Sequence, residues 1–117
     1  MKRVESLKKN YEFRRMYQRG NSAAGGALVI YCRKNPHGKS RLGLTASTKL
    51  GNAVKRNRVR RRMRELYRLN LDRVRPGFDM ILVARGRTLY ASWGELNALF
   101  ARLCKKLGIW LDTPQQN

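Results

Sequence analysis

The sequence is poor in acidic residues, histidine and cysteine, and each shortage excludes a class of protein. Its 117 residues hold 7 Asp and Glu against 27 Lys and Arg, with one His and two Cys. One histidine and two distant cysteines, Cys32 and Cys104, cannot form a zinc site of the usual spacing. We expect no metal bound by the protein, and we expect both thiols to be reduced and packed, because disulfides are rare in the cytosol.

Long apolar runs are also missing. No stretch of about 18 apolar residues occurs, so the sequence predicts no membrane-spanning segment. The start, MKRVESLKKNYEF, lacks the apolar centre of a secretory signal, and we therefore expect a cytoplasmic protein. An apolar content of 42% is too high for a disordered basic tail, so residues 1–117 are expected to form one domain, with loose ends at residues 1–8 and 112–117.

The excess of positive charge indicates the kind of partner. A formal charge of +20 opposes folding through self-repulsion, which an anionic partner relieves. Nucleic acid, an anionic membrane and an acidic protein all qualify at this point. Composition alone does not choose among them.

Hydrophobic periodicity and breaker residues predict the order of the elements. Helices are expected over residues 9–19, from about 51 to 71, and 92–107. Strands are expected over residues 27–33, 41–48 and 78–84, with a short edge strand within residues 21–26. The first two long strands are expected to pair as a hairpin, and the apolar third to be central. This order favours a two-layer domain of the α+β or α/β class.

The second helix carries the strongest signal. Its sequence includes KRNRVRRRMRE, and residues 49–64 hold eight basic residues and no acid. Val59, Met63, Leu66 and Tyr67 fall within an arc of about 100° on a helical projection, so they predict a buried stripe. The basic residues are thereby left on the outer face.

Two other interpretations of this helix, as an ordinary solvated surface helix or as a membrane-surface helix, are less well supported by its sequence. Ordinary solvated helices mix charges of both signs, because like charges at i, i+4 destabilise a helix. A membrane-surface helix requires no preference for Arg, and it favours Trp, Phe or Leu on its apolar face. Arginine forks bind phosphate with two hydrogen bonds, so the pattern favours nucleic acid.

Aromatic residues favour RNA over DNA, because unpaired bases stack on exposed rings. Phe13 and Tyr17 share one face of the first helix, and Tyr31 lies on a strand. Core packing is the alternative for each ring, and the sequence leaves it open. The backbone N–H groups near Gly51 and Asn52 add an anion site at the start of the basic helix.

An autonomous nuclease is poorly supported. Phosphodiester hydrolysis usually needs clustered carboxylates for metal ions, or a pair of histidines. The acids are scattered, and the one histidine, His37, lies in a predicted turn. We therefore expect no catalytic residue in the protein.

The run TKLGNAVKRNRVRRRMRE strongly resembles the signature of the protein subunit of bacterial ribonuclease P. The resemblance extends from about Leu7 to Leu107 and includes NYEFRRMY, RLGLTAST and DMILVAR. It implies an α+β fold, a two-layer α-β sandwich in the order αβββαβα. The four-stranded sheet would have a left-handed crossover through the basic helix, an exception to the usual rule.

The resemblance also implies a function. The holoenzyme removes the 5′ leader from precursor tRNA, and its RNA subunit holds the catalytic magnesium ions. The protein subunit would bind ribonuclease P RNA and the precursor tRNA, with no cofactor of its own and no DNA or membrane partner. A ribosomal or other structural RNA-binding protein is the alternative.

The positions that match the family define two expected binding surfaces. Those expected to bind the RNA subunit are Lys49, Lys55, Arg56, Asn57, Arg58, Arg60, Arg61 and Arg64. Those expected to line a leader-binding cleft between the first helix and the sheet are Phe13, Tyr17, Tyr31, Arg56, Asn57 and Arg85.

Overall fold

A computed structural model describes residues 4–115 and confirms the α+β class. The helices are α1 (Asn10–Arg19), α2 (Ala53–Leu69) and α3 (Trp93–Lys106). The strands are β1 (Glu5–Ser6), β2 (Asn21–Ala24), β3 (Leu28–Lys34), β4 (Arg41–Thr45) and β5 (Phe78–Ala84). Three short 3-10 helices are η1 (Thr48–Leu50), η2 (Leu71–Arg73) and η3 (Gly86–Leu89). Among these described residues, no helix is both long enough and apolar enough to cross a bilayer.

The strands form one sheet in the order β1-β4-β5-β3-β2. β5 is central, as its apolar run predicted, and it pairs antiparallel with β3 and parallel with β4. The predicted hairpin between residues 27–33 and 41–48 is wrong, because β5 lies between β3 and β4. Non-local pairing of this kind leaves no mark in the local sequence pattern.

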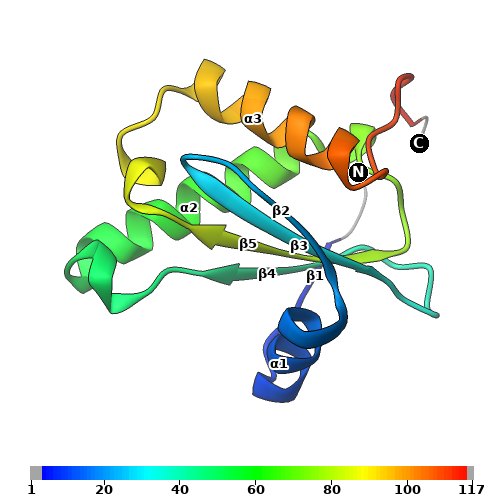
Figure 1. Cartoon of the computed structure of the whole chain (residues 1–117), viewed down its shortest axis with the longest axis horizontal. Coiled ribbons are helices and arrows are strands. Elements are labelled where there is room, and N and C mark those ends of the chain that lie inside the picture. The colour runs from blue at the N-terminus through cyan, green and yellow to red at the C-terminus, as the bar shows by residue number, and fades with distance from the viewer. Residues whose placement is uncertain (1–3, 116–117) are drawn as a thin grey trace.

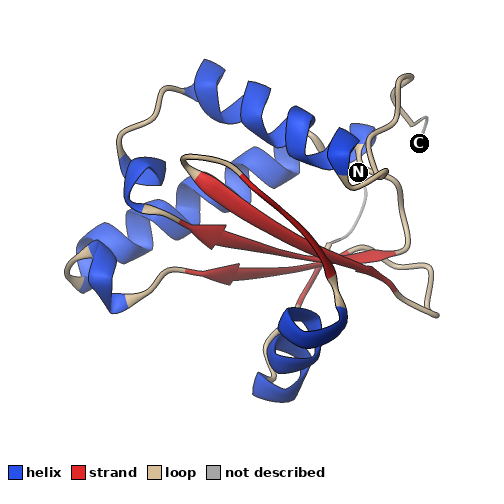
Figure 2. Ribbon diagram, viewed as in Figure 1, coloured by secondary structure: helices blue, strands red, loops and turns tan. Residues whose placement is uncertain are grey.

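Helices cover both faces of the sheet, so the two-layer arrangement is also wrong. In Figures 1 and 2, α2 and α3 lie on one side of the strands and α1 lies on the other. Successive side chains of a strand point to opposite faces. Met80 and Leu82 of β5 accordingly join the large core under α2 and α3, whereas Ile81 joins a smaller core with Leu7 and Met16 under α1.

The sheet has five strands and not four, because the N-terminal segment adds an edge. Glu5 and Ser6 pair in parallel with β4, and the buried Leu7 donates its N–H to the carbonyl of Leu42 at 2.9 Å. Residues 4–8 are therefore no loose end. At the other terminus, Asp112, Thr113 and Pro114 are exposed, but Gln115 donates its N–H to the carbonyl of Asp72 at 2.6 Å and so returns to the domain. Residues 1–3 and 116–117 lie outside the described residues.

The basic helix forms the predicted crossover. β4 and β5 are parallel neighbours, and the chain joins them through α2. The path from β4 through α2 to β5 turns in the left-handed sense in Figure 1. The side chain of Asn52 caps the start of α2 by accepting the N–H of Lys55 at 3.0 Å. The predicted stripe of α2 is buried throughout.

Candidate nucleic-acid interface

Three aromatic rings meet between α1 and the sheet. The centroids of Phe13 and Tyr17 lie 6.4 Å apart, and those of Tyr17 and Tyr31 lie 5.0 Å apart in an edge-to-face arrangement. Phe13 and Tyr31 are partly buried against the smaller core, whereas Tyr17 is 41% exposed. Core packing therefore accounts for much of Phe13 and Tyr31, while Tyr17 keeps surface for a ligand.

The strand beneath this cluster has a glycine that leaves room for a ring. A Cβ placed on Gly43 would lie 2.8 Å from Cζ of Phe13 and 3.3 Å from Cγ1 of Ile81. Any side chain at position 43 would therefore push Phe13 away from the sheet. The hydroxyl of Tyr17 meets the side-chain oxygen of Thr45 at 2.8 Å, which ties the exposed ring to the end of β4.

A partly buried arginine fixes α1 against the sheet. Arg41 binds both carboxylate oxygens of Asp79, each at 2.7 Å, and donates a further 2.7 Å hydrogen bond to Glu12 of α1. The hydrogen bonds from Arg41 to Asp79, and then to Glu12, raise the pKa of the Arg41 guanidinium. Asn35 donates to the same Asp79 at 2.9 Å, so the network also holds the turn after β3. Because Glu12 precedes Phe13, this network sets the position of the rings.

The start of α2 presents donors to solvent. Gly51 has a φ of 126°, a conformation that glycine adopts readily, and its flanks Lys49 and Lys55 are exposed. The side chain of Asn52 satisfies only the N–H of Lys55, which leaves the N–H groups of Ala53 and Val54 free of helical partners. The start of α2 therefore has the backbone donors on which the predicted anion site depends.

The outer face of α2 is polar and basic along its length. Its exposed polar side chains are Lys55, Asn57, Arg58, Arg61, Arg64 and Arg68, and the apolar Val54 and Leu69 near the two ends of the helix are exposed as well. Arg56 and Arg60 are half-buried, and Arg60 donates to the side chain of Asn57 at 3.1 Å. The Nε of Arg56 is shielded from solvent and has no hydrogen-bond partner among residues 4–115. Asn57, Arg58, Arg61 and Arg64 thus lie away from the buried stripe, whereas Arg56 and Arg60 lie at or beside it.

One arginine of the basic run faces inward. Arg62 donates to the carbonyls of Thr88, Leu89 and Ala91, the first two at 2.6 and 2.8 Å. Its guanidinium also lies 5.3 Å from the ring centroid of Trp93. Arg62 therefore anchors the segment between β5 and α3 and is not available to a ligand. Its helical position, at the edge of the buried stripe, is the sequence signal that separates it from its neighbours.

The expected cleft residues come from α1, the sheet and the segments that follow β4 and β5. The structure brings the three rings together, and it places Arg56, Asn57 and Arg85 on segments that follow β4 and β5. Thr45 and Val83 are register partners near the C-terminal ends of β4 and β5, and Arg85 follows Val83 by two residues. The structure thus brings the three rings into contact with one another and places the three polar residues on the segments that leave β4 and β5.

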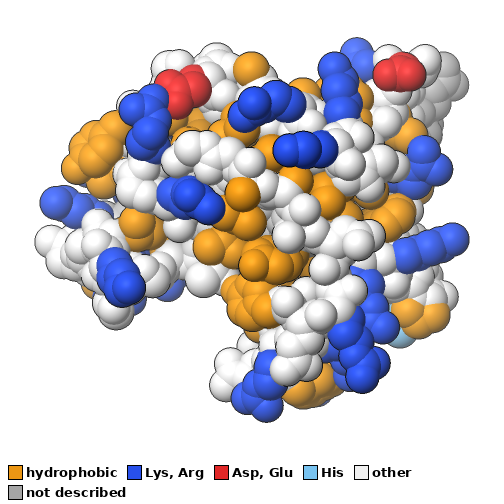
Figure 3. Space-filling model, viewed as in Figure 1, with side chains coloured by type: hydrophobic (Ala, Val, Ile, Leu, Met, Phe, Trp, Pro, Cys, Tyr) orange, Lys and Arg blue, Asp and Glu red, His pale blue; other side chains and the backbone are white. Residues whose placement is uncertain are grey.

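Most of the acids are already paired. Glu5 pairs with Lys39, Glu12 and Asp79 with Arg41, Glu65 with Arg68, and Glu95 with Arg87. Figure 3 shows Lys and Arg side chains spread over one face of the molecule, including the region of α1, with few Asp or Glu side chains. Within the described part of the chain, no three His, Cys, Asp or Glu side chains gather as possible metal ligands.

Three features of the site were missed at the level of sequence. The Arg41 network joins residues 29 and 38 positions apart, so no local spacing marks it. The close approach of Gly43 to Phe13 depends on how α1 lies on the sheet. A basic hollow on α1, lined by Tyr11 and four arginines among others, was also not foreseen.

Known proteins match the chain over most of its length. A profile described as ribonuclease P matches residues 1–108. The ribonuclease P protein component of Clostridioides difficile is 41% identical over 108 residues, which cover 92% of this chain and 95% of that protein. The corresponding protein of Alkaliphilus oremlandii is 39% identical over 109 residues, covering 93% and 96%.

Solved structures agree with these sequence matches. The RNase P protein of Staphylococcus aureus superposes with a TM-score of 0.79 at 29% identity, covering 92% of this chain and 99% of that one. The RNase P protein of Thermotoga maritima gives a TM-score of 0.76 at 28% identity, covering 86% and 96%.

Proposed function

This chain belongs to the ribonuclease P protein family, and from that premise we propose that it works as an RNA-binding subunit with two separate surfaces. The family assigns it to the removal of 5′ leaders from precursor tRNA. One surface, the outer face of α2, binds ribonuclease P RNA. The other, the ring cluster under α1, binds the leader of the precursor.

The observation that carries this proposal is the separation of the two faces of α2. Val59, Met63 and Leu66 are buried, so folding uses the apolar stripe and leaves the guanidinium face unoccupied. Arginine forks match phosphate oxygens, and the free N–H groups at the helix start add to the same attraction. A structured RNA presents many phosphates to such a face.

The leader surface follows from the ring cluster. Single-stranded RNA is bound by stacking of its bases on aromatic side chains. Tyr17 offers an exposed ring whose orientation is fixed by Thr45 and Tyr31. Arg56, Asn57 and Arg85 lie on segments that follow β4 and β5, and in this proposal they supply phosphate contacts to the same single-stranded RNA.

The chemistry belongs to the RNA subunit in this proposal. The two carboxylates nearest the ring cluster, Glu12 and Asp79, are both bound to Arg41 and so do not suit a magnesium ion. The protein offsets phosphate repulsion between the RNA subunit and the precursor, which lets the magnesium sites of the RNA fill at lower metal concentration. Such an activity takes place in the cytoplasm, where precursor tRNA is made.

The test is cleavage of a precursor tRNA by the purified chain together with its cognate RNA subunit at low magnesium. We expect 5′ leader removal by the mixture, and none by the protein alone after digestion of carried RNA. A structural RNA-binding protein would bind the RNA without supporting cleavage. Cleavage by the RNA-free protein alone would show that the polypeptide is itself the nuclease, and would end the proposal.

Salt dependence provides a second measurement of the same surface. Each phosphate contact lowers the log–log slope of affinity against salt by about 0.7 to 0.9. We therefore expect binding of ribonuclease P RNA to weaken steeply as salt rises. A nearly flat titration would contradict the role of α2.

A further inference from the structure

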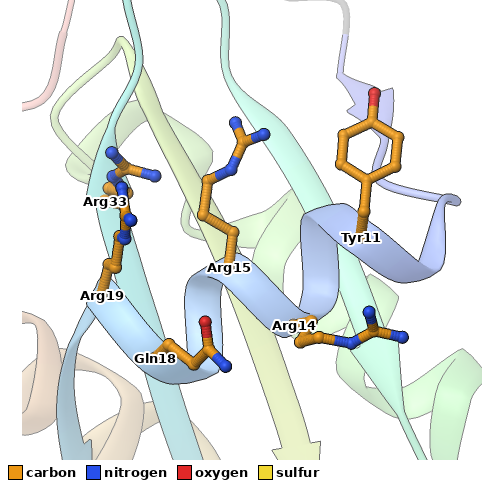
Figure 4. Close-up of a pocket in the computed structure, with 6 residues that line it drawn as sticks. All are labelled: Tyr11, Arg14, Arg15, Gln18, Arg19 and Arg33. Atoms are coloured by element: carbon orange, nitrogen blue, oxygen red, sulfur yellow. The ribbon is translucent and has the colours of Figure 1, made fainter.

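A hollow of about 410 Å³ lies on the outer flank of α1, away from the ring cluster. Figure 4 shows its lining: Tyr11, Arg14, Arg15, Gln18 and Arg19 from α1, and Arg33 from β3. At 100° per residue, Arg15 and Arg19 fall on the opposite flank of the helix from Tyr17. The Arg15 and Arg19 side of the hollow therefore faces away from Tyr17, whereas Arg14, at about 60° from Tyr17, lies between the two surfaces.

The lining is arranged by helical spacing. Tyr11, Arg15 and Arg19 follow one another at intervals of four, so their side chains leave the same side of the helix. The guanidinium of Arg15 lies 5.6 Å from the ring centroid of Tyr11, an attraction that orients the arginine along this side. In Figure 4, Arg33 stands beside Arg19, so the strand completes the row of guanidinium groups.

The positive charge of this hollow has no internal compensation. None of Arg14, Arg15, Arg19 or Arg33 forms an ion pair within residues 4–115. An adjoining hollow shares Arg15 and Arg33 and contains Glu12 and Asp79. Both acids, however, are bound to Arg41 at 2.7 Å, which leaves little of their charge for other arginines. The guanidinium groups therefore repel one another until an anion enters.

We propose that this hollow, the α1 pocket, is a phosphate-binding site for an RNA backbone. Guanidinium groups bind phosphate oxygens through paired N–H donors, and those of Arg15, Arg19 and Arg33 lie on the same side of α1 in Figure 4, with Arg14 and Gln18 lining the hollow from the other side of the helix. The phosphate comes either from ribonuclease P RNA or from the precursor tRNA. That choice of sources rests on the proposed function, whereas phosphate binding itself does not.

The first test uses the full chain and inorganic phosphate. Arginine Nε–H signals are followed by NMR as phosphate is added to the wild type and to Arg15→Gln/Arg19→Gln. The matched control, Arg75→Gln/Arg102→Gln, removes the same charge at exposed positions elsewhere. We expect saturable shifts of signals from the pocket in the wild type and in the control, and their loss in the pocket variant. Equal shifts in all three proteins, or none in any, would overturn the proposal.

The second test identifies the RNA. Binding of ribonuclease P RNA, and binding of precursor tRNA with a long or short leader to the assembled enzyme, are measured over a range of salt. Loss of two phosphate contacts makes the negative log–log slope shallower by about 1.4 to 1.8 in the affected binding measurement and weakens binding by about tenfold. If the pocket variant, and not the control, loses affinity for only one of the two RNAs, the result supports the α1 pocket and identifies which RNA supplies the phosphate.

Pocket and control variants that behave alike in every arm would refute the RNA-binding role. That result is distinct from a failure of the proposed function. The latter would appear as a wild-type protein that supports no leader removal.

Discussion

Arg41 and Asp79 are register partners across the β4–β5 pair, and their side chains join through two hydrogen bonds of 2.7 Å. The third donor group of Arg41 reaches Glu12 of α1. One guanidinium therefore connects two central strands to the helix that carries Phe13 and Tyr17. The side chains of Arg41 and Asp79 are only 21% and 11% exposed, so water competes weakly for these bonds.

The first prediction concerns this network. Arg41→Met removes all three hydrogen bonds and leaves two carboxylates without their partner, so we expect a loss of about 3 kcal/mol in the free energy of unfolding. Urea unfolding at constant salt and anion concentration measures it. Arg87→Met is the control, because the Arg87–Glu95 pair is 63% and 42% exposed and its loss should be undetectable. Equal effects of the two changes would show that Arg41 does not hold α1.

The second prediction concerns the glycine beneath Phe13. Gly43→Ala places a Cβ within 2.8 Å of the Phe13 ring, so the ring must shift, at a cost of about 1–3 kcal/mol in stability. Thermal unfolding at fixed anion concentration measures the loss. Gly26→Ala is the matched control, because nothing lies within 4 Å of the added Cβ.

A double variant separates a steric effect from a backbone effect. If Gly43→Ala acts through the Phe13 ring, then Phe13→Leu should restore part of the lost stability by removing ring atoms from the contact. Strictly additive losses in the double variant would mean that the two side chains do not interact.

The third prediction concerns the exposed ring of the cluster. Tyr17→Ala should weaken binding of leader-bearing tRNA to the assembled enzyme by about 1–3 kcal/mol, the worth of one stacked base, and leave mature tRNA unchanged. Tyr17→Phe keeps the ring and loses only the hydrogen bond with Thr45, so it should retain most of the affinity. Equal weakening of both tRNAs would identify Tyr17 as a support of the fold and not as a leader contact.

The fourth prediction concerns the two cysteines, which are free and buried as the sequence led us to expect. Burial raises the pKa of Cys32 to about 11 and that of Cys104 to about 12. Because the thiolate is the reactive form, the native protein should resist alkylation by iodoacetamide at pH 8, and both thiols should react once it is unfolded in urea. Mass spectrometry counts the adducts. Rapid labelling without denaturant would contradict the packing of β3 against α3.

The sequence predicted those parts of the fold that depend on local periodicity. The stripe of α2 and the apolar run of β5 are buried as expected, and Ser92 caps α3 by accepting the N–H of Glu95 at 3.1 Å. It failed where distant segments meet. Glu5 and Ser6 form a strand only because β4 offers an open edge, and a pair of polar residues carries no strand signal of its own.

In the candidate site too, some residues could be predicted from local sequence patterns and others could not. The outer face of α2 follows from helical geometry once the buried stripe is recognised, so its basic residues could be found without a structure. The proximity of Tyr31 to Tyr17 came only from resemblance to a family, because the two rings lie on different elements. The α1 pocket required both Arg33 on a strand and the knowledge that Glu12 and Asp79 are already paired.

The last prediction compares two adjacent arginines of α2. Arg61 is exposed, whereas Arg62 donates to three carbonyls and lies against Trp93. Arg62→Ala should lower the free energy of unfolding by about 2 kcal/mol, because several buried carbonyl groups lose a charged donor. Arg61→Ala should leave unfolding unchanged and reduce the salt dependence of binding to ribonuclease P RNA by about 0.7 to 0.9 in log–log slope.

Urea unfolding and salt titrations of the two variants, side by side, measure both effects. Both proteins lose one positive charge from the same helix, so a difference between them reports where each side chain points and not the charge itself. If both changes weakened RNA binding to the same extent and neither affected unfolding, the Arg62 side chain would be exposed to solvent in the native protein. The contact between α2 and the segment before α3 would then be absent from the native protein.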